Sequence, residues 1–217
     1  MQLELLPTLE VHRELYAMPR GMERFRAYIA KMTGGTGEIA LPISAMNPMG
    51  KDHTIAAVEA WIACGAEKAA AEAMQSAQAR LAAVPGRLRV ALVLADDVAG
   101  GWTNRWTTDF AHRFESAALY TRDFCVGLLW ASETPSAGRA AEAVLQSIAR
   151  AVYEREHGPA RSLGEKLAQE RFAGVDLGPV PAQYLDATDA PTLFACLYGD
   201  YAATSLGYAP IGIRSLR

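Results

Sequence analysis

The sequence predicts a helix-rich α/β fold in which helices cover a small, mostly parallel sheet of about three or more strands. Residues 89–95 (RVALVLA) and 124–131 (FCVGLLWA) are continuous apolar runs, as expected of strands buried on both faces. These runs alternate with longer segments of helical periodicity, the order that produces parallel sheets. Because few strands are expected in 217 residues, a mainly α protein with a small sheet is the alternative.

The N-terminal segment, residues 1–33, is expected to be helical. Apolar residues at helical spacing predict helices over 8–17 and 22–31. Residues 38–44 (EIALPIS) then read as a strand, since apolar residues dominate this run. Pro42 has no amide hydrogen for a sheet ladder, which places this strand at the edge of the sheet or near its own end.

Longer helices are expected between the strands. One begins with Asp52 as its N-cap and runs to about residue 83, with a bend or break at Gly65. A short helix over 104–114 follows the first apolar run. A long helix follows Thr134, which stands before a proline as an N-cap would, and ends near residue 157.

The C-terminal part, from about residue 160 to 217, is also expected to be helical. Ser162 and Glu165 have the spacing of a capping box, and a last helix is expected over 191–206. The chain contains no internal repeat and no linker of the length that separates domains. We therefore expect residues 1–217 to form a single α/β domain.

The charge and hydropathy of the chain argue against several classes of protein. The net charge is -3, and no dense Lys/Arg run is present, so we expect no nucleic-acid partner. No run approaches the roughly 18 apolar residues of a membrane span, so we expect no membrane association. The N-terminus lacks the basic start and apolar core of a signal peptide, which favours a cytoplasmic location.

Cysteine and arginine usage supply two smaller expectations. The three cysteines, Cys64, Cys125 and Cys196, are far apart in the sequence and form no CxxC pair or Cys/His cluster. This pattern supports neither a disulfide framework nor a structural zinc site, and it favours buried thiols. Arg greatly outnumbers Lys and Ala is abundant, which is typical of a GC-rich bacterial genome.

The loop over residues 44–53 follows the expected strand at 38–44 and precedes a helix. Residues 45–52 (AMNPMGKD) resemble the phosphate-binding P-loop, with Gly50 and Lys51 in the glycine-lysine positions. Asp52 departs from that motif, because it stands where a hydroxyl should hold the metal and its charge would repel phosphate. A rigid turn in which Asp52 only caps the helix is the alternative.

His53 lies in the first turn of the helix that follows this loop. A helix N-terminus disfavours a charged imidazolium, so a neutral ring is expected. Neutral imidazole is the form that acts as a general base or as a metal ligand. A hydrogen-bonded surface histidine without function is the alternative.

The loop over residues 96–112 carries the densest set of reactive side chains in the sequence. Two carboxylates, Asp96 and Asp97, end the apolar run; because neighbours on a strand point to opposite faces, one of them should face a site. Asp109 and His112 could join that carboxylate and His53 around a divalent metal ion. Alternatively, Arg105, Asp109 and Arg113 form a solvent-facing ladder of ion pairs, with Trp102, Trp106 and Phe110 in the core.

These observations leave the function unknown and give three hypotheses. The first is a small-molecule-binding or metal-assisted enzyme domain whose pocket is formed by loops 44–53 and 96–112 and holds a small anionic ligand. The second is a non-catalytic assembly protein that forms a homo-oligomer through Ala-rich or aromatic helical faces, and the third is a degenerate P-loop-like nucleotide binder. The cofactor and any metal are unknown. The candidate catalytic residues are His53, Asp97, Asp109 and His112, and the candidate ligand-binding residues are Asn47, Gly50, Lys51, Asn104 and Arg105.

Overall fold

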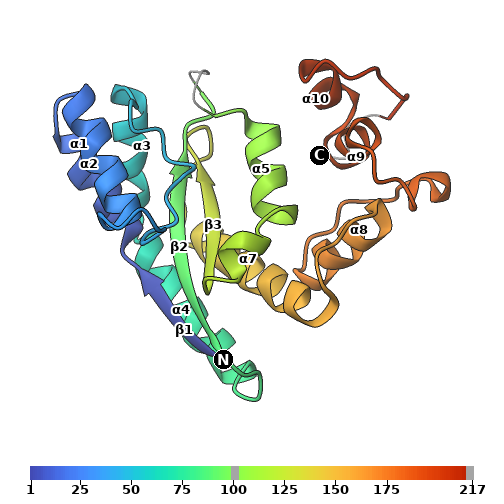
Figure 1. The fold of residues 1–217 in the computed structure, drawn as a ribbon, viewed down its shortest axis with the longest axis horizontal. Helices are drawn as coiled ribbons and strands as arrows, with labels where there is room; N and C mark the ends of the chain where they lie inside the picture. Colours follow the sequence, from blue (N-terminus) through green and yellow to red (C-terminus); the bar gives the residue numbers. More distant parts are fainter. Residues whose placement is uncertain (99–102, 214–217) are drawn as a thin grey trace.

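The computed structural model describes residues 1–98 and 103–213 (Figure 1). Its described strands form one three-stranded parallel sheet in the order β1-β2-β3, with β1 at Gln2–Leu6, β2 at Arg87–Ala95 and β3 at Phe124–Trp130. In the register of the sheet, Leu5 lies beside Val90, and Val90 lies beside Cys125. The predicted helix-rich α/β fold with a small parallel sheet is confirmed.

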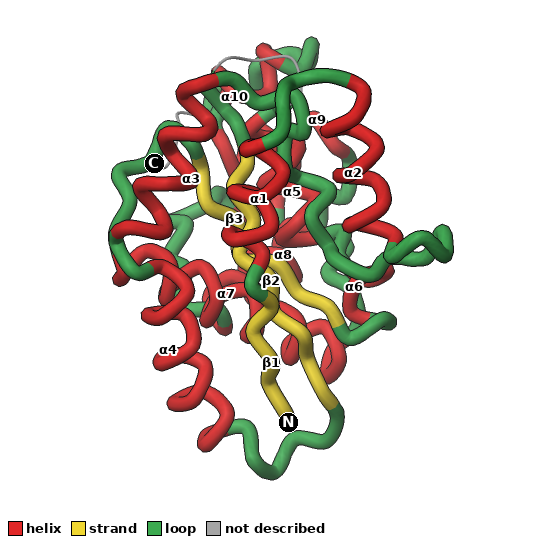
Figure 2. Tube along the Cα trace, turned by 90° about the vertical axis from the view of Figure 1, so that its left-hand side faces the viewer, coloured by secondary structure: helices red, strands yellow, loops and turns green. Residues whose placement is uncertain are grey.

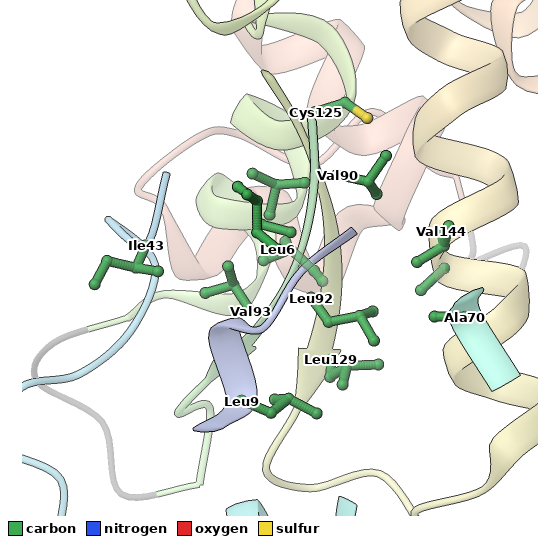
Figure 3. Packing of buried hydrophobic residues seen from close by; sticks show 14 of the residues in the cluster. Leu6, Leu9, Ile43, Ala70, Val90, Leu92, Val93, Cys125, Leu129 and Val144 are labelled. Carbon is green, nitrogen blue, oxygen red and sulfur yellow. The ribbon is translucent and has the colours of Figure 1, made fainter. Parts of the chain in front are cut away.

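Helices cover both faces of this sheet. Helices α4 (Ala66–Arg80) and α7 (Ala137–His157) pack against each other and against one face of the sheet (Figure 2). Helix α1 (Thr8–Ala17) contacts β2, and helix α5 (Arg105–Phe114) contacts β3. Figure 3 shows the side chains of Leu92 and Leu129 directed toward Ala70 and Val144, whereas Val93 points to the side where Ile43 lies. Strands buried on both faces explain why β2 and β3 are continuous apolar runs.

The close contact between β3 and α7 depends on Gly127. A Cβ atom on this glycine would lie 3.0 Å from the backbone carbonyl carbon and oxygen of Ala143. Any side chain larger than hydrogen would therefore push α7 away from the sheet.

The first strand lies elsewhere than the sequence predicts. Residues 38–44 do not pair with the sheet; the amides of Ala40 and Leu41 donate to the carbonyl of Met32 at the end of the preceding helix. Strand β1 instead occupies the first residues of the chain, so the N-terminal segment is not wholly helical. The apolar character of 38–44 reflects packing rather than pairing, because Ile43 is fully buried against the core.

The helices before β2 agree closely with expectation. Helix α2 spans Met22–Thr33, and the predicted long helix is divided into α3 (Asp52–Ala63) and α4, with Gly65 in the left-handed conformation between them. The expectation that Asp52 is the N-cap is wrong by one residue: the N-cap of α3 is Lys51, and Asp52 is the first helical residue, which places its charge in the first turn.

Two expectations about later helices are corrected and one is confirmed. Ser136 rather than Thr134 caps α7, and its hydroxyl accepts a hydrogen bond from the Arg139 amide. The predicted capping box of Ser162 and Glu165 is present at the start of α8 (Leu163–Phe172). The expected helix over 191–206 is two helices, because Gly199 interrupts it. The remaining elements are α6 (Ala117–Tyr120), α8 (Leu163–Phe172), a 3-10 turn (Ala182–Tyr184), α9 (Ala190–Tyr198) and α10 (Asp200–Ser205).

The C-terminal helices build a second apolar cluster beside the sheet. Phe110 and Phe114 of α5 belong to this cluster together with Leu163, Phe194 and Tyr198. Helix α5 therefore touches β3 and also anchors α8 and α9. Among the described residues, no helix combines the length and the apolar character needed to cross a membrane.

Candidate functional site

Asp96 is the centre of a hydrogen-bond network just beyond the carboxyl end of β2. Its side chain is 2% exposed. Asn47 Nδ2 donates to Oδ2 over 3.0 Å, and Thr54 Oγ1 donates to the same oxygen over 3.1 Å. His53 Nε2 lies 2.9 Å from Oδ1, which also accepts from the amide of Val98 at 3.3 Å. The two predicted loops therefore meet, and they meet at Asp96.

The network keeps the Asp96 carboxyl ionised in spite of its burial. Burial alone would raise the pKa of Asp96, since it disfavours the charged form. The hydrogen bonds from His53, Asn47 and the Val98 amide outweigh this effect, and the pKa of Asp96 is lowered. A buried negative charge thus lies against one nitrogen of a histidine ring.

The backbone of the first loop is fixed by Tyr16 and Asn47. Tyr16 donates its hydroxyl to the Asn47 carbonyl over 2.8 Å, and Asn47 Oδ1 accepts from the Met49 amide at 3.0 Å. A Cβ on Gly50 would lie 2.9 Å from the Tyr16 hydroxyl, which explains the glycine without any ligand. Asn47 and Gly50 therefore hold the loop in place, whereas the side chain of Lys51 is exposed.

His53 is the one member of the network that combines a reactive group with access to solvent. Its side chain is 31% exposed. With Nε2 directed at Asp96, the proton is expected on Nε2 and the lone pair on Nδ1. Within the described ranges, His53 Nδ1 has no hydrogen-bond partner in the protein. A buried carboxylate that orients a histidine in this way is the arrangement of a general base.

Asp97 makes a separate set of contacts. It pairs with the Arg105 guanidinium, and its carboxylate accepts from the Ser132 amide at 3.0 Å and the Ser132 hydroxyl at 2.6 Å. Arg105 also lies above the Trp130 ring, 4.7 Å from its centroid. Asp96 is therefore the carboxylate that faces the first loop, while Asp97 ties the start of α5 to the end of β3.

The other candidates on α5 have structural partners. Asn104 Oδ1 caps the helix by accepting from the amides of Trp106 and Thr107. Asp109 pairs with Arg113 at 2.8 Å and accepts from the Tyr198 hydroxyl at 2.9 Å. The expected solvent-facing ladder is wrong in two respects: Arg105 pairs with Asp97, and the side chains of Asp109 and Arg113 are only 13% and 12% exposed.

His112 is held in one tautomer in the last turn of α5. Its Nδ1 lies 2.9 Å from the carbonyl of Thr108, which accepts the Nδ1 proton. Burial lowers the pKa of His112, although the Thr108 carbonyl and the nearby Asp109 charge oppose this shift. The ring is therefore neutral near pH 7, with its lone pair on Nε2.

A hollow of about 200 Å³ lies between the two loops. We call it the hydroxyl-lined hollow, because four of its seven lining residues carry a hydroxyl group. Ser44 and Ala45 form one wall, and the other wall belongs to the start and the exposed face of α5. That second wall consists of Thr103, Thr107, Thr108, Ala111 and His112.

The expected metal cluster does not form. Within residues 1–98 and 103–213, no three His, Cys, Asp or Glu side chains make a group that could hold a metal ion. His53 and Asp96 contact each other, while Asp109 contacts Arg113 and Tyr198. Trp102 lies outside the described residues.

Sequence reasoning overlooked several residues of the site. Thr54 and Tyr16 complete the network around Asp96, but neither belongs to a motif. The threonines of the hollow could have been identified from the sequence, because residues 103–108 (TNRWTT) concentrate hydroxyl groups at the start of a predicted helix. Comparison of the chain with protein-family models, with curated proteins and with solved structures found no match.

Proposed function

We propose that this chain is an enzyme that moves protons on a small polar molecule, with His53 as the general acid or base. The observation that carries this proposal is the buried Asp96 carboxylate, which accepts from His53 at the carboxyl end of the central strand. In parallel sheets, ligands collect at this end of the strands. The hydroxyl-lined hollow, which contains Ser44 and Ala45 of the same loop, supplies a place for the molecule, and His53 lies outside its lining.

The proposed proton transfer depends on the negative charge of Asp96 beside the His53 ring. Asp96 stabilises the imidazolium that forms when His53 Nδ1 accepts a proton, because the buried carboxylate is negative. Asn47 and Thr54 hold the carboxylate in position, so that the ring needs little rearrangement during transfer. Positioned acid–base groups of this kind contribute roughly 10²–10⁴-fold to rates.

The lining of the hollow indicates the class of substrate. Ser44, Thr103, Thr107 and Thr108 offer hydroxyl groups that can donate and accept, and His112 offers a lone pair. A compact molecule with several hydroxyl or carbonyl groups fits this lining better than an apolar one. At about 200 Å³ the hollow is smaller than a typical drug-sized pocket.

The test is a turnover screen of small hydroxylated and carbonyl metabolites, followed by proton NMR in D₂O. The wild-type chain is expected to turn over, or to exchange protons of, at least one compound. His53→Gln should lower kcat by about 10²-fold or more, since it removes the proton acceptor. Asp96→Asn should also lower kcat and should change its pH profile, because it removes the charge that orients the ring.

One control and one further variant complete the test. His157→Gln replaces an exposed histidine at the end of α7 and should leave kcat unchanged. Thr107→Val removes one hydroxyl of the hollow and should raise KM more than it lowers kcat. An active His53→Gln variant with wild-type kcat would refute the assignment of His53.

The nucleotide-binding alternative finds little support in the geometry. A P-loop follows a strand of the sheet, whereas residues 38–44 are not a strand. Thr54, a hydroxyl near the helix start, already donates to Asp96. Thermal stability in ATP with Mg²⁺ tests this alternative, and we expect no shift beyond that caused by salt.

A second candidate function, assembly of copies of this chain, is favoured by a groove between α4, α7 and α8. The groove measures about 490 Å³, and Ala73 and Ala77 of α4 form part of its mainly apolar lining. Leu145 and Phe172 beside them are 40% and 50% exposed. Light scattering tests this candidate: a dimer that becomes a monomer in Phe172→Asp supports it, and a monomeric wild-type chain at all concentrations contradicts it.

A further inference from the structure

A second, smaller cavity lies between α5, β3 and α7, apart from the Asp96 network. Its volume is about 30 Å³. Three arginines line it, Arg113 from α5 and Arg139 and Arg150 from α7, together with Asp109, His112 and the apolar wall of β3. Three guanidinium groups in one cavity raise the question of what they bind.

Two of these arginines use only part of their hydrogen-bonding capacity. Arg150 donates from Nε and Nη2 to the two oxygens of Glu170, over 2.6 and 2.8 Å. Arg113 contacts Asp109 through Nε and donates to Glu170 from Nη1, both at 2.8 Å. Toward the described part of the chain, Arg113 Nη2 and Arg150 Nη1 donate no hydrogen bond.

The third arginine has a buried nitrogen with no partner. Arg139 lies 3.4 Å from Glu133 through Nε, and its Nη2 donates to Glu133 over 3.5 Å and to the Leu128 carbonyl over 3.4 Å. Its Nη1 is buried and has no hydrogen-bond partner among the described residues. An unsatisfied buried donor is unfavourable, and native proteins seldom leave one without a ligand or water.

The carboxylates of the cluster do not fill this need. Glu170 is held by Arg113 and Arg150, and Asp109 by Arg113 and the Tyr198 hydroxyl. Both carboxylates are therefore already occupied by donors. A third carboxylate, Glu133, pairs with Arg139 from outside the cavity lining, and its Oε2 is itself buried without a hydrogen bond to the described residues. Among the residues that line the cavity, donors of all three arginines remain, which calls for an acceptor.

We infer that this cavity binds the carboxylate group of a small organic acid between Arg113, Arg139 and Arg150. The volume of the cavity indicates the chemical class of its ligand. About 30 Å³ accommodates roughly two oxygen-sized positions, because one water needs about 10–15 Å³ by this measure. Two oxygens match a carboxylate and not the four of phosphate. Guanidinium groups bind carboxylates through paired N–H donors, which suits the planar geometry of this group.

The first experiment compares acetate with acetamide in thermal denaturation, in chloride-free buffer at constant ionic strength. The two probes have nearly the same shape, but only acetate is an anion. Acetate should raise Tm in a saturable manner and acetamide should not. Equal effects of both probes, or a larger effect of phosphate than of acetate, would overturn the inference.

Variants assign the site. Arg139→Gln should weaken acetate binding at least tenfold, since it removes the nitrogen that lacks a partner. Arg155→Gln is the matched control, because Arg155 lies on the same helix with a side chain 28% exposed against 29% for Arg139, and pairs with Asp123 outside the cavity. It should bind acetate as the wild type does, and loss of binding in this variant would overturn the assignment.

A third variant avoids any buried arginine. Gln146 lines the cavity at a half-buried position, and Gln146→Glu places a negative charge there. This change should weaken acetate binding by charge repulsion while the chain stays folded. Unchanged acetate affinity in a folded Gln146→Glu protein would contradict the inference. Failure of the His53 assignment would leave this result unaffected, since the two sites are tested by different residues.

Discussion

At the scale of single residues, His12 is an imidazole enclosed by the core of the protein. It is fully buried in α1, and neither ring nitrogen has a hydrogen-bond partner in the part of the chain that the structure describes. Burial lowers the pKa of His12 from 6.5 to about 3. The ring is therefore neutral in the folded state over most of the acid range, whereas it takes up a proton in the unfolded chain below pH 6.5.

This difference makes His12 a source of acid instability. Because the unfolded state binds more protons between pH 6.5 and about 3, the free energy of unfolding decreases as the pH falls through that window. The decrease from this group is about 1.4 kcal/mol per pH unit. His12→Leu should remove that contribution, which urea denaturation at several pH values would measure.

The exposed His157 provides the comparison for this prediction. His157→Leu leaves His12 in place, so the acid-side slope attributed to His12 should persist in that variant. If His12→Leu retains the full wild-type slope, the buried imidazole is not its source.

At the scale of secondary-structure elements, the contact between β3 and α7 depends on the absence of a side chain at Gly127. Gly127→Ala should destabilise the protein by about 1–3 kcal/mol, because its Cβ would overlap the Ala143 backbone. Gly138→Ala is the control within α7 itself, since a Cβ there would meet no atom of the described residues within 4 Å. Denaturant titration should show Gly138→Ala to be neutral or stabilising, and equal losses for both would contradict the packing argument.

Glu170 joins three helices through charge. Its side chain is fully buried in α8 and receives hydrogen bonds from Arg113 of α5 and Arg150 of α7. Glu170→Gln leaves two buried cations short of their counter-charge, which should cost roughly 3–5 kcal/mol of unfolding free energy. The exposed Glu156→Gln is the control and should lie within about 0.5 kcal/mol of wild type. A similarly small effect at Glu170 would show that this network does not hold the helices together.

At the scale of the whole molecule, the sequence predicts the parts of the fold that have strong periodicity. Strands β2 and β3 are visible because burial on both faces requires an unbroken apolar run. Strand β1 is not visible, because its outward-facing residues are exposed and it spans only five residues. The run at 38–44 imitates a strand because it packs on the core without pairing with it.

The candidate site, like the fold, could be predicted from the sequence only in part. The meeting of the two loops could be predicted, since both contain polar residues beside the ends of apolar runs. Which of Asp96 and Asp97 faces the first loop could not, because this depends on partners such as Thr54 and Ser132. The arginine cavity left no sequence signal, since Arg113, Arg150 and Glu170 are brought together only by helix packing. A cytoplasmic location, a bacterial source and a homo-oligomer remain predictions.

The most direct measurement is chemical-shift mapping of the backbone amides during titration with each metabolite of the turnover screen. The proposed function predicts that a binding metabolite perturbs His53 and Val98 together with Ser44, Thr103 and Thr108, the residues around Asp96 and the hydroxyl-lined hollow. Perturbations confined to the groove of α4, α7 and α8, or none with any metabolite, would contradict it.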